Sequence, residues 1–191
     1  MKLRKHLLIV SLLHVLCTEG ELLNLNGEWM LQNHDGSKVV EEALVPGYVH
    51  TALLKAELIK DPYFRNNDEL YRLIDYDNWT YSRTFNMKDT LLNKMSILLI
   101  CEGLDTVADV YINTVFVGQS TNMFQRYVWD IKKALVSGSN KIIIKFTSAV
   151  TYSAYKSKLY NYTVPPNCPP PVQHGECHVN LLRKKQCSFS W

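Results

Sequence analysis

The sequence lacks a long apolar run and any large excess of charge of either sign. Its most apolar stretch extends from Leu7 to Leu16, whereas a helix that crosses a bilayer takes roughly 20 apolar residues. No membrane-spanning segment is therefore predicted. Internal repeats and low-complexity tracts are also missing. A content of 47% hydrophobic and 20% charged residues is ordinary for a globular domain.

The apolar stretch begins just after three basic residues within the first five positions. A short basic region followed by a brief apolar one is typical of a secretory signal peptide. We expect residues 1–17 to be removed by cleavage after Cys17, with cleavage after Gly20 as the alternative. A buried amino-terminal helix is the competing interpretation, but it would not require the basic start.

The formal charge of +3 comes from this leader. Residues 1–17 hold three of the 21 Lys and Arg residues and none of the 18 Asp and Glu residues, which leaves 18 of each sign in the rest of the chain. A neutral chain implies no basic face, so nucleic acid is excluded as an expected partner.

Common catalytic motifs are missing as well: the sequence contains no G-x-S-x-G, no H-E-x-x-H and no phosphate-binding loop. Glu102, Asp105 and Asp109 are close in sequence, but carboxylates beside a buried strand more often cap turns. No catalytic pair is assigned to them. The segment DPYFRNNDELYR, residues 61–72, mixes polar and aromatic residues. A sugar-binding or inter-domain surface and a solvated loop explain it equally well.

The cysteines indicate an oxidising compartment. Cys168 and Cys177 enclose the Pro-rich stretch PPPVQHGE, and we expect them to form a local disulfide. A zinc site is the alternative, although its spacing matches no standard finger; its ligands would be His174, Cys177, His178 and Cys187. Neither a metal nor a cofactor is therefore expected. Cys101, within the apolar SILLICEG, is interpreted as a buried free thiol, and the state of Cys187 is left open.

Two triplets are acceptors for N-glycosylation in a secreted protein: NWT at Asn78 and NYT at Asn161. A single triplet of this kind occurs by chance. Two of them behind a signal peptide support one another, and we expect glycans at both positions.

Most of the remaining chain shows the period-2 alternation of strands that are buried on one face. Predicted strands fall within LNLNGEWML, KVVEEALV, WTYSRTF, TVADVYINTVFVGQ with a hairpin at Asn113–Thr114, RYVWDI and KIIIKFTSA, whereas SILLICEG is expected to be buried on both faces. Strands of this length at this spacing predict an all-β jelly-roll β-sandwich. After Tyr152 we expect a long surface excursion, and CHVNLLRKKQCSFSW is strand-like again.

One short helix is predicted to plug an end of the sandwich. Val49, Leu53, Ala56 and Ile59 recur at helical spacing. Asp61–Pro62 ends this pattern, because proline disfavours a helical residue before it.

Several stretches together resemble a known family. NLNGEWML, VPGYVHTALLKAELIKDPYFRNNDELYRLIDYDNWTYSRTF, EGLDTVADVYIN, STNMFQRYVWDI and VPPNCPPPVQHGECHVNLLRKKQCSFSW are similar to the amino-terminal domain of animal lysosomal β-mannosidases, which are family 2 glycoside hydrolases. The Pro-rich segment with Cys168 and Cys177 favours β-mannosidase over β-glucuronidase or β-galactosidase. The resemblance covers nearly all of residues 18–191.

The resemblance implies a galactose-binding-domain-like jelly roll that is incomplete at its carboxyl end. In the family, the Trp that matches Trp191 is the first residue of a Trp-Asp-Trp-Gly-Pro motif. This motif is followed by the rest of this domain, an immunoglobulin-like sandwich and a TIM barrel. Both catalytic glutamates lie on the barrel, so no catalytic residue is expected in this chain. Trp191 matches the first position of the motif that helps form the mannose pocket, and it is the one substrate contact carried over.

The implied activity is hydrolysis of terminal non-reducing β-D-mannose residues during breakdown of glycoprotein oligosaccharides in the lysosome. The partner is then a β-mannoside oligosaccharide, and the full-length enzyme is expected to be a monomer. Two alternatives stay open: a free-standing carbohydrate-binding module, and the equivalent domain of another family 2 glycosidase.

The proposed disulfide is directly testable. A non-reduced proteolytic digest should contain the peptides of Cys168 and Cys177 joined to one another, because secretion exposes this short loop to oxidation. Mass spectrometry before and after reduction is the measurement. Free thiols at both positions in secreted material would rule the pairing out.

Overall fold

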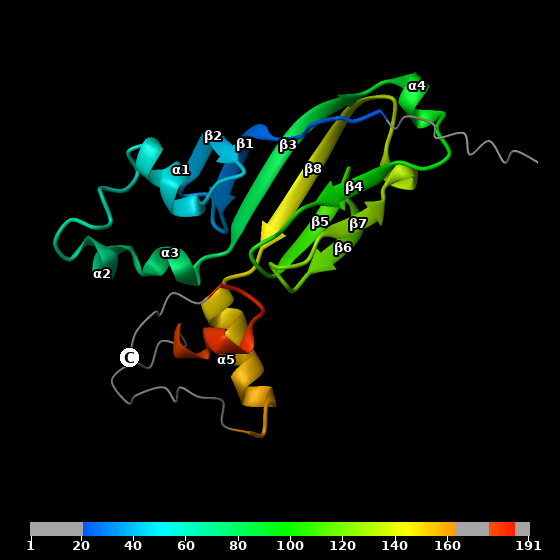
Figure 1. Cartoon of the computed structure of the whole chain (residues 1–191). Helices are drawn as coiled ribbons and strands as arrows, with labels where there is room; N and C mark the ends of the chain where they lie inside the picture. Colours follow the sequence, from blue (N-terminus) through cyan, green and yellow to red (C-terminus); the bar gives the residue numbers. More distant parts are fainter. Residues whose placement is uncertain (1–20, 163–175, 186–191) are drawn as a thin grey trace, which may run out of the picture.

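The computed structural model describes residues 21–162 and 176–185, and it shows two antiparallel sheets with helices at their ends (Figure 1). The larger sheet has six strands in the order β2-β1-β3-β8-β5-β6, and the smaller pairs β4 with β7. Their bounds are β1 Gly27–Asn33, β2 Val39–Val45, β3 Trp79–Met87, β4 Leu98–Cys101, β5 Ala108–Ile112, β6 Val115–Ser120, β7 Tyr127–Asp130 and β8 Gly138–Phe146.

The alternating pattern of the sequence determines which face of the large sheet is buried. Along β3, Tyr81 and Phe85 are buried, and along β8, Ile142 and Ile144 are buried. β3 and β8 pair along their whole length, from Trp79 opposite Phe146 to Met87 opposite Gly138. The expected all-β sandwich is confirmed.

The core lies between the two sheets. Leu31, Val110 and Ile112 of the large sheet have no accessible surface. Gly118 on β6 faces the indole of Trp129 on β7, and a Cβ atom at this glycine would lie 2.2 Å from the Trp129 Nε1 atom. The sheets therefore approach at this point because residue 118 has no side chain.

The predicted hairpin between β5 and β6 is confirmed. Both turn residues have positive φ, 48° at Asn113 and 72° at Thr114, as a type I′ turn requires. The Asn113 side chain donates to Asn140 Oδ1 at 2.7 Å and to the Ala134 carbonyl at 3.0 Å. These bonds satisfy the buried amide of Asn140, whose own Nδ2 donates to the Val136 and Gly138 carbonyls.

The predicted helix exists as α1, Val49–Lys55, with Ala52 and Leu53 buried. It is not the only helix of the described chain, so the expectation of one short helix was too low. The others are α2 Asn67–Tyr71, α3 Leu73–Tyr76, α4 Asp89–Leu92 and α5 Ala149–Leu159, with 3₁₀ turns η1 Lys132–Ala134 and η2 Glu176–Leu181.

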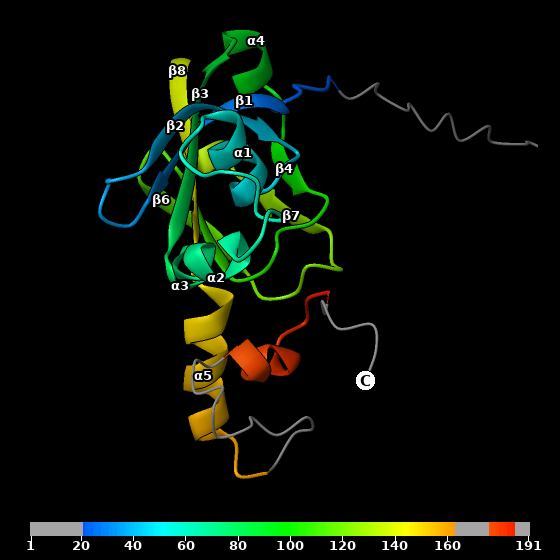
Figure 2. The same ribbon diagram turned by 90° about the vertical axis from the view of Figure 1, so that its left-hand side faces the viewer.

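α5 replaces the first part of the expected surface excursion. Its sequence carries little apolar periodicity, and only Val150 and Ser153 are buried along the helix. Its first residues are fixed by hydrogen bonds instead. Ser148 Oγ accepts from the Thr151 amide at 3.2 Å, and the Ser148 amide donates to Asn78 Oδ1 at 2.8 Å. Figure 2 shows α5 extending beyond the sheets with η2 packed beside it.

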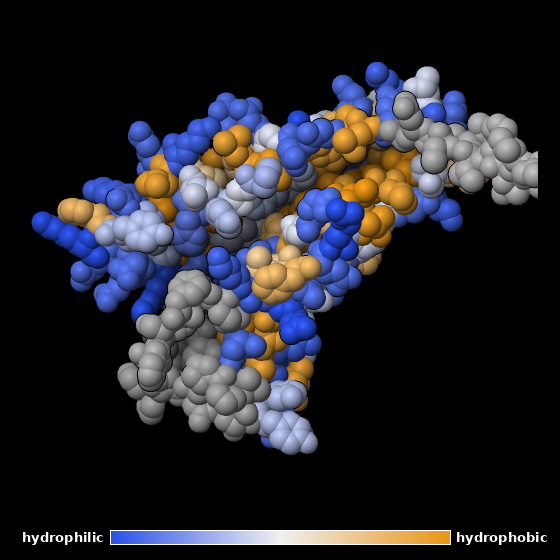
Figure 3. All heavy atoms as spheres, in the orientation of Figure 1, coloured by the Kyte–Doolittle hydropathy of each residue, from blue (hydrophilic) through white to orange (hydrophobic). Residues whose placement is uncertain are grey.

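Two strand predictions were wrong in detail. β4 is not buried on both faces: Leu98 and Ile100 are 52% and 49% exposed, because no other element of the described structure covers the face of the small sheet to which they point. Figure 3 shows apolar side chains gathered around β4 and towards α4. The stretch that begins at Cys177 starts as the 3₁₀ turn η2 rather than as a strand.

Two neighbouring leucines of α1 give a matched test of the core. Leu53 is fully buried, whereas Leu54 is 40% exposed on the same helix. Leu53→Ala should lower the free energy of unfolding by about 2–5 kcal/mol, because it removes buried methyl groups and leaves a cavity. Leu54→Ala should lower it by no more than about 1 kcal/mol. Urea unfolding of both variants measures the difference, and equal losses would contradict the placement of α1.

Candidate functional site

The structure does not place the residue expected to contact substrate. Trp191 lies outside the described residues, as do Cys168, His174 and Cys187. Cys177 belongs to η2. The disulfide and the role of Trp191 therefore stay predictions.

The two glycosylation acceptors lie in different environments. Asn161 is exposed just beyond α5. Asn78 is also exposed, directly before β3, but its side-chain oxygen accepts a hydrogen bond from the Ser148 amide at the start of α5. Asn78 thus also links β3 to α5. Glycans at both positions stay a prediction.

The described segment closest in sequence to Trp191 is held against two loops. Asn122 and Arg183 form a parallel β-bridge, and the Met123 amide donates to the Arg183 carbonyl at 2.9 Å. Lys184 Nζ lies 3.3 Å from Asp105 Oδ2. This ion pair joins the segment to the Gly103–Leu104–Asp105–Thr106 turn, which lies within the stretch EGLDTVADVYIN of the resemblance.

A groove lies between α5 and η2, and we name it the α5–η2 groove. Its volume is about 710 Å³. The ammonium group of Lys156 lies 5.3 Å from the centre of the Tyr152 ring, a cation–π contact. The described lining residues are Thr121, Tyr152, Lys156, Leu159, Tyr160, Asn180, Leu181, Leu182 and Arg183. The sequence prediction missed this groove because it missed α5.

The three neighbouring carboxylates are not arranged as a catalytic pair. Glu102 binds Arg126 Nε at 2.8 Å, Asp105 pairs with Lys184, and Asp109 accepts from Gln119 Nε2 at 2.9 Å. Each is engaged with a different partner. Across residues 21–162 and 176–185, no three His, Cys, Asp or Glu side chains could together hold a metal ion. In this same part of the chain, no helix is long and apolar enough to cross a membrane.

Cys101 is a free thiol at the end of β4, and it is half-buried. Burial, with a smaller contribution from the charge of Glu102, raises the pKa of this thiol to about 11. The group is therefore protonated at neutral pH, which makes it a poor nucleophile.

The segment 61–72 presents aromatic side chains to solvent. Tyr63 is 97% exposed and Phe64 is 57% exposed. The Arg65 guanidinium lies 5.1 Å from the centre of the Phe64 ring. Neither of the two explanations offered for this segment is decided by these contacts.

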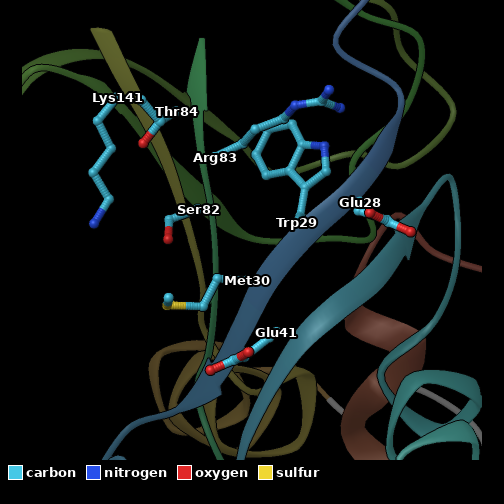
Figure 4. A pocket seen from close by; sticks show the side chains of 8 residues that line it. All are labelled: Glu28, Trp29, Met30, Glu41, Ser82, Arg83, Thr84 and Lys141. Carbon is cyan, nitrogen blue, oxygen red and sulfur yellow. The ribbon is translucent and has the colours of Figure 1, made fainter. Parts of the chain in front are cut away.

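A second groove, of about 290 Å³, lies on the outer face of the large sheet (Figure 4). Met30, Ser82 and Lys141 point to one side of the strands, whereas the Trp29 ring and Arg83 lie on the other. Trp29 Nε1 donates to the Leu25 carbonyl at 2.8 Å, and Arg83 donates to the Leu25 and Asn26 carbonyls. Since no aromatic ring of the described lining faces the groove, stacking of a sugar ring is not available there.

Comparison with known proteins decides the family. The model of the glycosyl hydrolase 2 galactose-binding domain-like family matches residues 29–191. The chain belongs to this family. The β-mannosidase of Mus musculus is 46% identical over 187 residues, which is 97% of this chain and 21% of that protein. The β-mannosidase of Capra hircus is 47% identical over 175 residues, which is 91% of this chain and 20% of that protein.

Solved structures agree with this assignment. The β-D-mannosidase of Dictyoglomus thermophilum superposes with a TM-score of 0.72 at 31% identity, over 75% of this chain and 18% of that one. An exo-chitosanase of Amycolatopsis orientalis, 19% identical with a TM-score of 0.56 over 67% of this chain and 17% of that one, shares the fold alone. The chain thus spans about a fifth of the length of its curated relatives, and the resemblance drawn from its motifs is confirmed.

The raised pKa of Cys101 predicts its reactivity. The rate of iodoacetamide alkylation at Cys101 should rise with a midpoint near pH 11 rather than near its ordinary pKa of 9.0, because the thiolate is the reacting form. Mass spectrometry of the Cys101 peptide separates it from the other cysteines. The raised pKa of Cys101 also predicts a contribution of this thiol to the free energy of unfolding. This contribution is present below pH 9 and is lost as pH rises from about 9 to about 11. A midpoint at or below pH 9 would contradict the burial of this thiol.

Proposed function

We propose that this chain is the amino-terminal supporting domain of a β-mannosidase, which removes terminal non-reducing β-D-mannose residues from oligosaccharides. The observation that carries the proposal is the identity of 46–47% to animal β-mannosidases across 91–97% of the chain. Other family 2 glycosidases are disfavoured, because the relatives compared at this level of identity are β-mannosidases.

In this proposal the domain supports the substrate pocket and does not perform the bond cleavage. Retaining glycosidases use two carboxyl groups about 5–5.5 Å apart, and the TIM barrel of the family supplies them. The contribution of this chain is Trp191, six residues after Lys185. The Asp105–Lys184 ion pair and the Met123–Arg183 hydrogen bond support the proposal, because they fix where the polypeptide leading to Trp191 begins.

The proposal also includes passage through the secretory pathway, which accounts for the signal peptide, the glycans and the disulfide. Residues 1–17 act as the signal peptide, residues 18–191 form part of the sugar-binding jelly roll, and the enzyme works in lysosomes as a monomer. Asn78 and Asn161 carry glycans, and Cys168–Cys177 closes the Pro-rich loop. The exposure of Asn161 supports its place in this proposal.

A chimera tests the proposal. The matching amino-terminal part of the mouse β-mannosidase is replaced by this chain, and hydrolysis of an aryl β-mannoside is measured. The chimera should be active and should prefer β-mannosides over β-glucuronides. A folded, secreted chimera without β-mannosidase activity would overturn the proposal.

Within that chimera, Trp191→Ala should lower kcat/KM by about 10- to 100-fold, the range that a lost pocket contact produces. Trp191→Phe is the matched control and should recover most of the loss, because it keeps an aromatic surface. Equal activity of the chimera and its Trp191→Ala variant would remove the role assigned to this residue.

The 191-residue chain by itself should not hydrolyse an aryl β-mannoside, because the proposal places both catalytic carboxylates outside it. The mouse enzyme serves as the positive control under the same conditions. Turnover by purified chain, free of host glycosidase, would show that a catalytic pair exists here after all.

A further inference from the structure

Charge is unevenly distributed along this chain. From residue 149 to residue 191 the sequence contains five Lys and Arg residues and one acidic residue, Glu176. From residue 18 to residue 148 it contains 13 Lys and Arg residues and 17 Asp and Glu residues. The neutral total of residues 18–191 thus combines a basic carboxyl-terminal part with an acidic remainder, so the α5–η2 groove lies in the basic part.

Two of these cations line the α5–η2 groove from opposite elements. Lys156 is exposed on α5, and its ammonium group is held over the Tyr152 ring. Arg183 is exposed just beyond η2, and the bridge to Asn122 fixes its backbone. No Asp or Glu belongs to the described lining, so the positive potential is not cancelled within these residues.

The other lining groups suit a polyhydroxylated molecule. Thr121 and the two tyrosines, Tyr152 and Tyr160, carry hydroxyls that donate and accept hydrogen bonds. Leu159 and the Tyr160 ring are 60% and 53% exposed, and they offer apolar surface to the C–H face of a sugar. A volume of about 710 Å³ lies within the range of small-ligand pockets.

We propose that the α5–η2 groove binds a saccharide that carries a tetrahedral oxyanion, a phosphate or sulfate ester. Lys156 and Arg183 contact the anionic group, since charge-assisted hydrogen bonds to phosphate are the strongest available here. The hydroxyl and apolar groups contact the sugar ring. Binding of this kind is distinct from hydrolysis of a neutral β-mannoside and requires no catalytic carboxylate.

The test is titration of the full chain with mannose 6-phosphate, with mannose and inorganic phosphate as the two partial ligands. Isothermal calorimetry should show binding of mannose 6-phosphate that weakens as ionic strength rises, because the contacts are solvent-exposed charges. Mannose and phosphate should each bind at least about tenfold more weakly, since each makes only part of the contacts. Phosphate binding as tightly as mannose 6-phosphate would overturn the saccharide assignment, and mannose binding equally tightly would overturn the role of the oxyanion.

Two lysines of α5 give a matched pair of variants. Lys156→Met and Arg183→Gln should each weaken binding of mannose 6-phosphate by about fivefold to tenfold, by loss of one charged contact. Lys158→Met removes the same charge from an exposed position of α5 that does not line the groove in the described structure. It should leave the affinity for mannose 6-phosphate unchanged. Lys156→Arg should retain binding. If Lys158→Met weakens binding as much as Lys156→Met, attraction is general and the groove is not the site.

Discussion

The ladder between β3 and β8 is the interaction on which the rest of the structure depends. Its nine residue pairs place both strands in the middle of the large sheet, with β1 on one side and β5 on the other. The ladder also positions the segments that adjoin its ends. Ser148, two residues after β8, donates its amide to Asn78, just before β3, and its hydroxyl donates to the Asp75 carbonyl at 2.6 Å. This corner sets the direction of α5, and hence one wall of the α5–η2 groove.

The opposite wall is positioned from the other half of the molecule. The loop after β6 and the turn before β5 hold Arg183 and Lys184 through a β-bridge, which includes the Met123–Arg183 backbone hydrogen bond, and through one ion pair. The ion pair is partly exposed, so its own contribution to stability is small, on the order of 0–1 kcal/mol. Its importance is geometric, because it determines where the polypeptide towards Trp191 leaves the described domain. The same segment therefore serves both the proposed mannose pocket and the proposed anion groove.

The three carboxylates that are neighbours in the sequence do not form a catalytic pair. Glu102, Asp105 and Asp109 are each engaged by a different partner. The exposed apolar side chains at Leu98, Ile100 and Val128 lie instead on the outer face of the small sheet. An exposed apolar face of this kind is suited to packing against another part of a protein. The chain spans about a fifth of the length of its curated relatives.

The sequence by itself determined the strands, the β5–β6 hairpin, α1 and the family, because each depends on local signals. Alternation of apolar residues along Trp79–Met87 and the turn residues at Asn113–Thr114 are read within a few positions. Only the tertiary structure decided α5, the exposure of β4 and the α5–η2 groove. α5 is fixed by Ser148 and by contacts to residues about 70 positions earlier, and the groove pairs Lys156 with Arg183 through packing of α5 on η2. Contacts between distant residues leave no periodic pattern in the sequence. The proximity of Lys156 and Arg183 could therefore be recognised only in the folded structure.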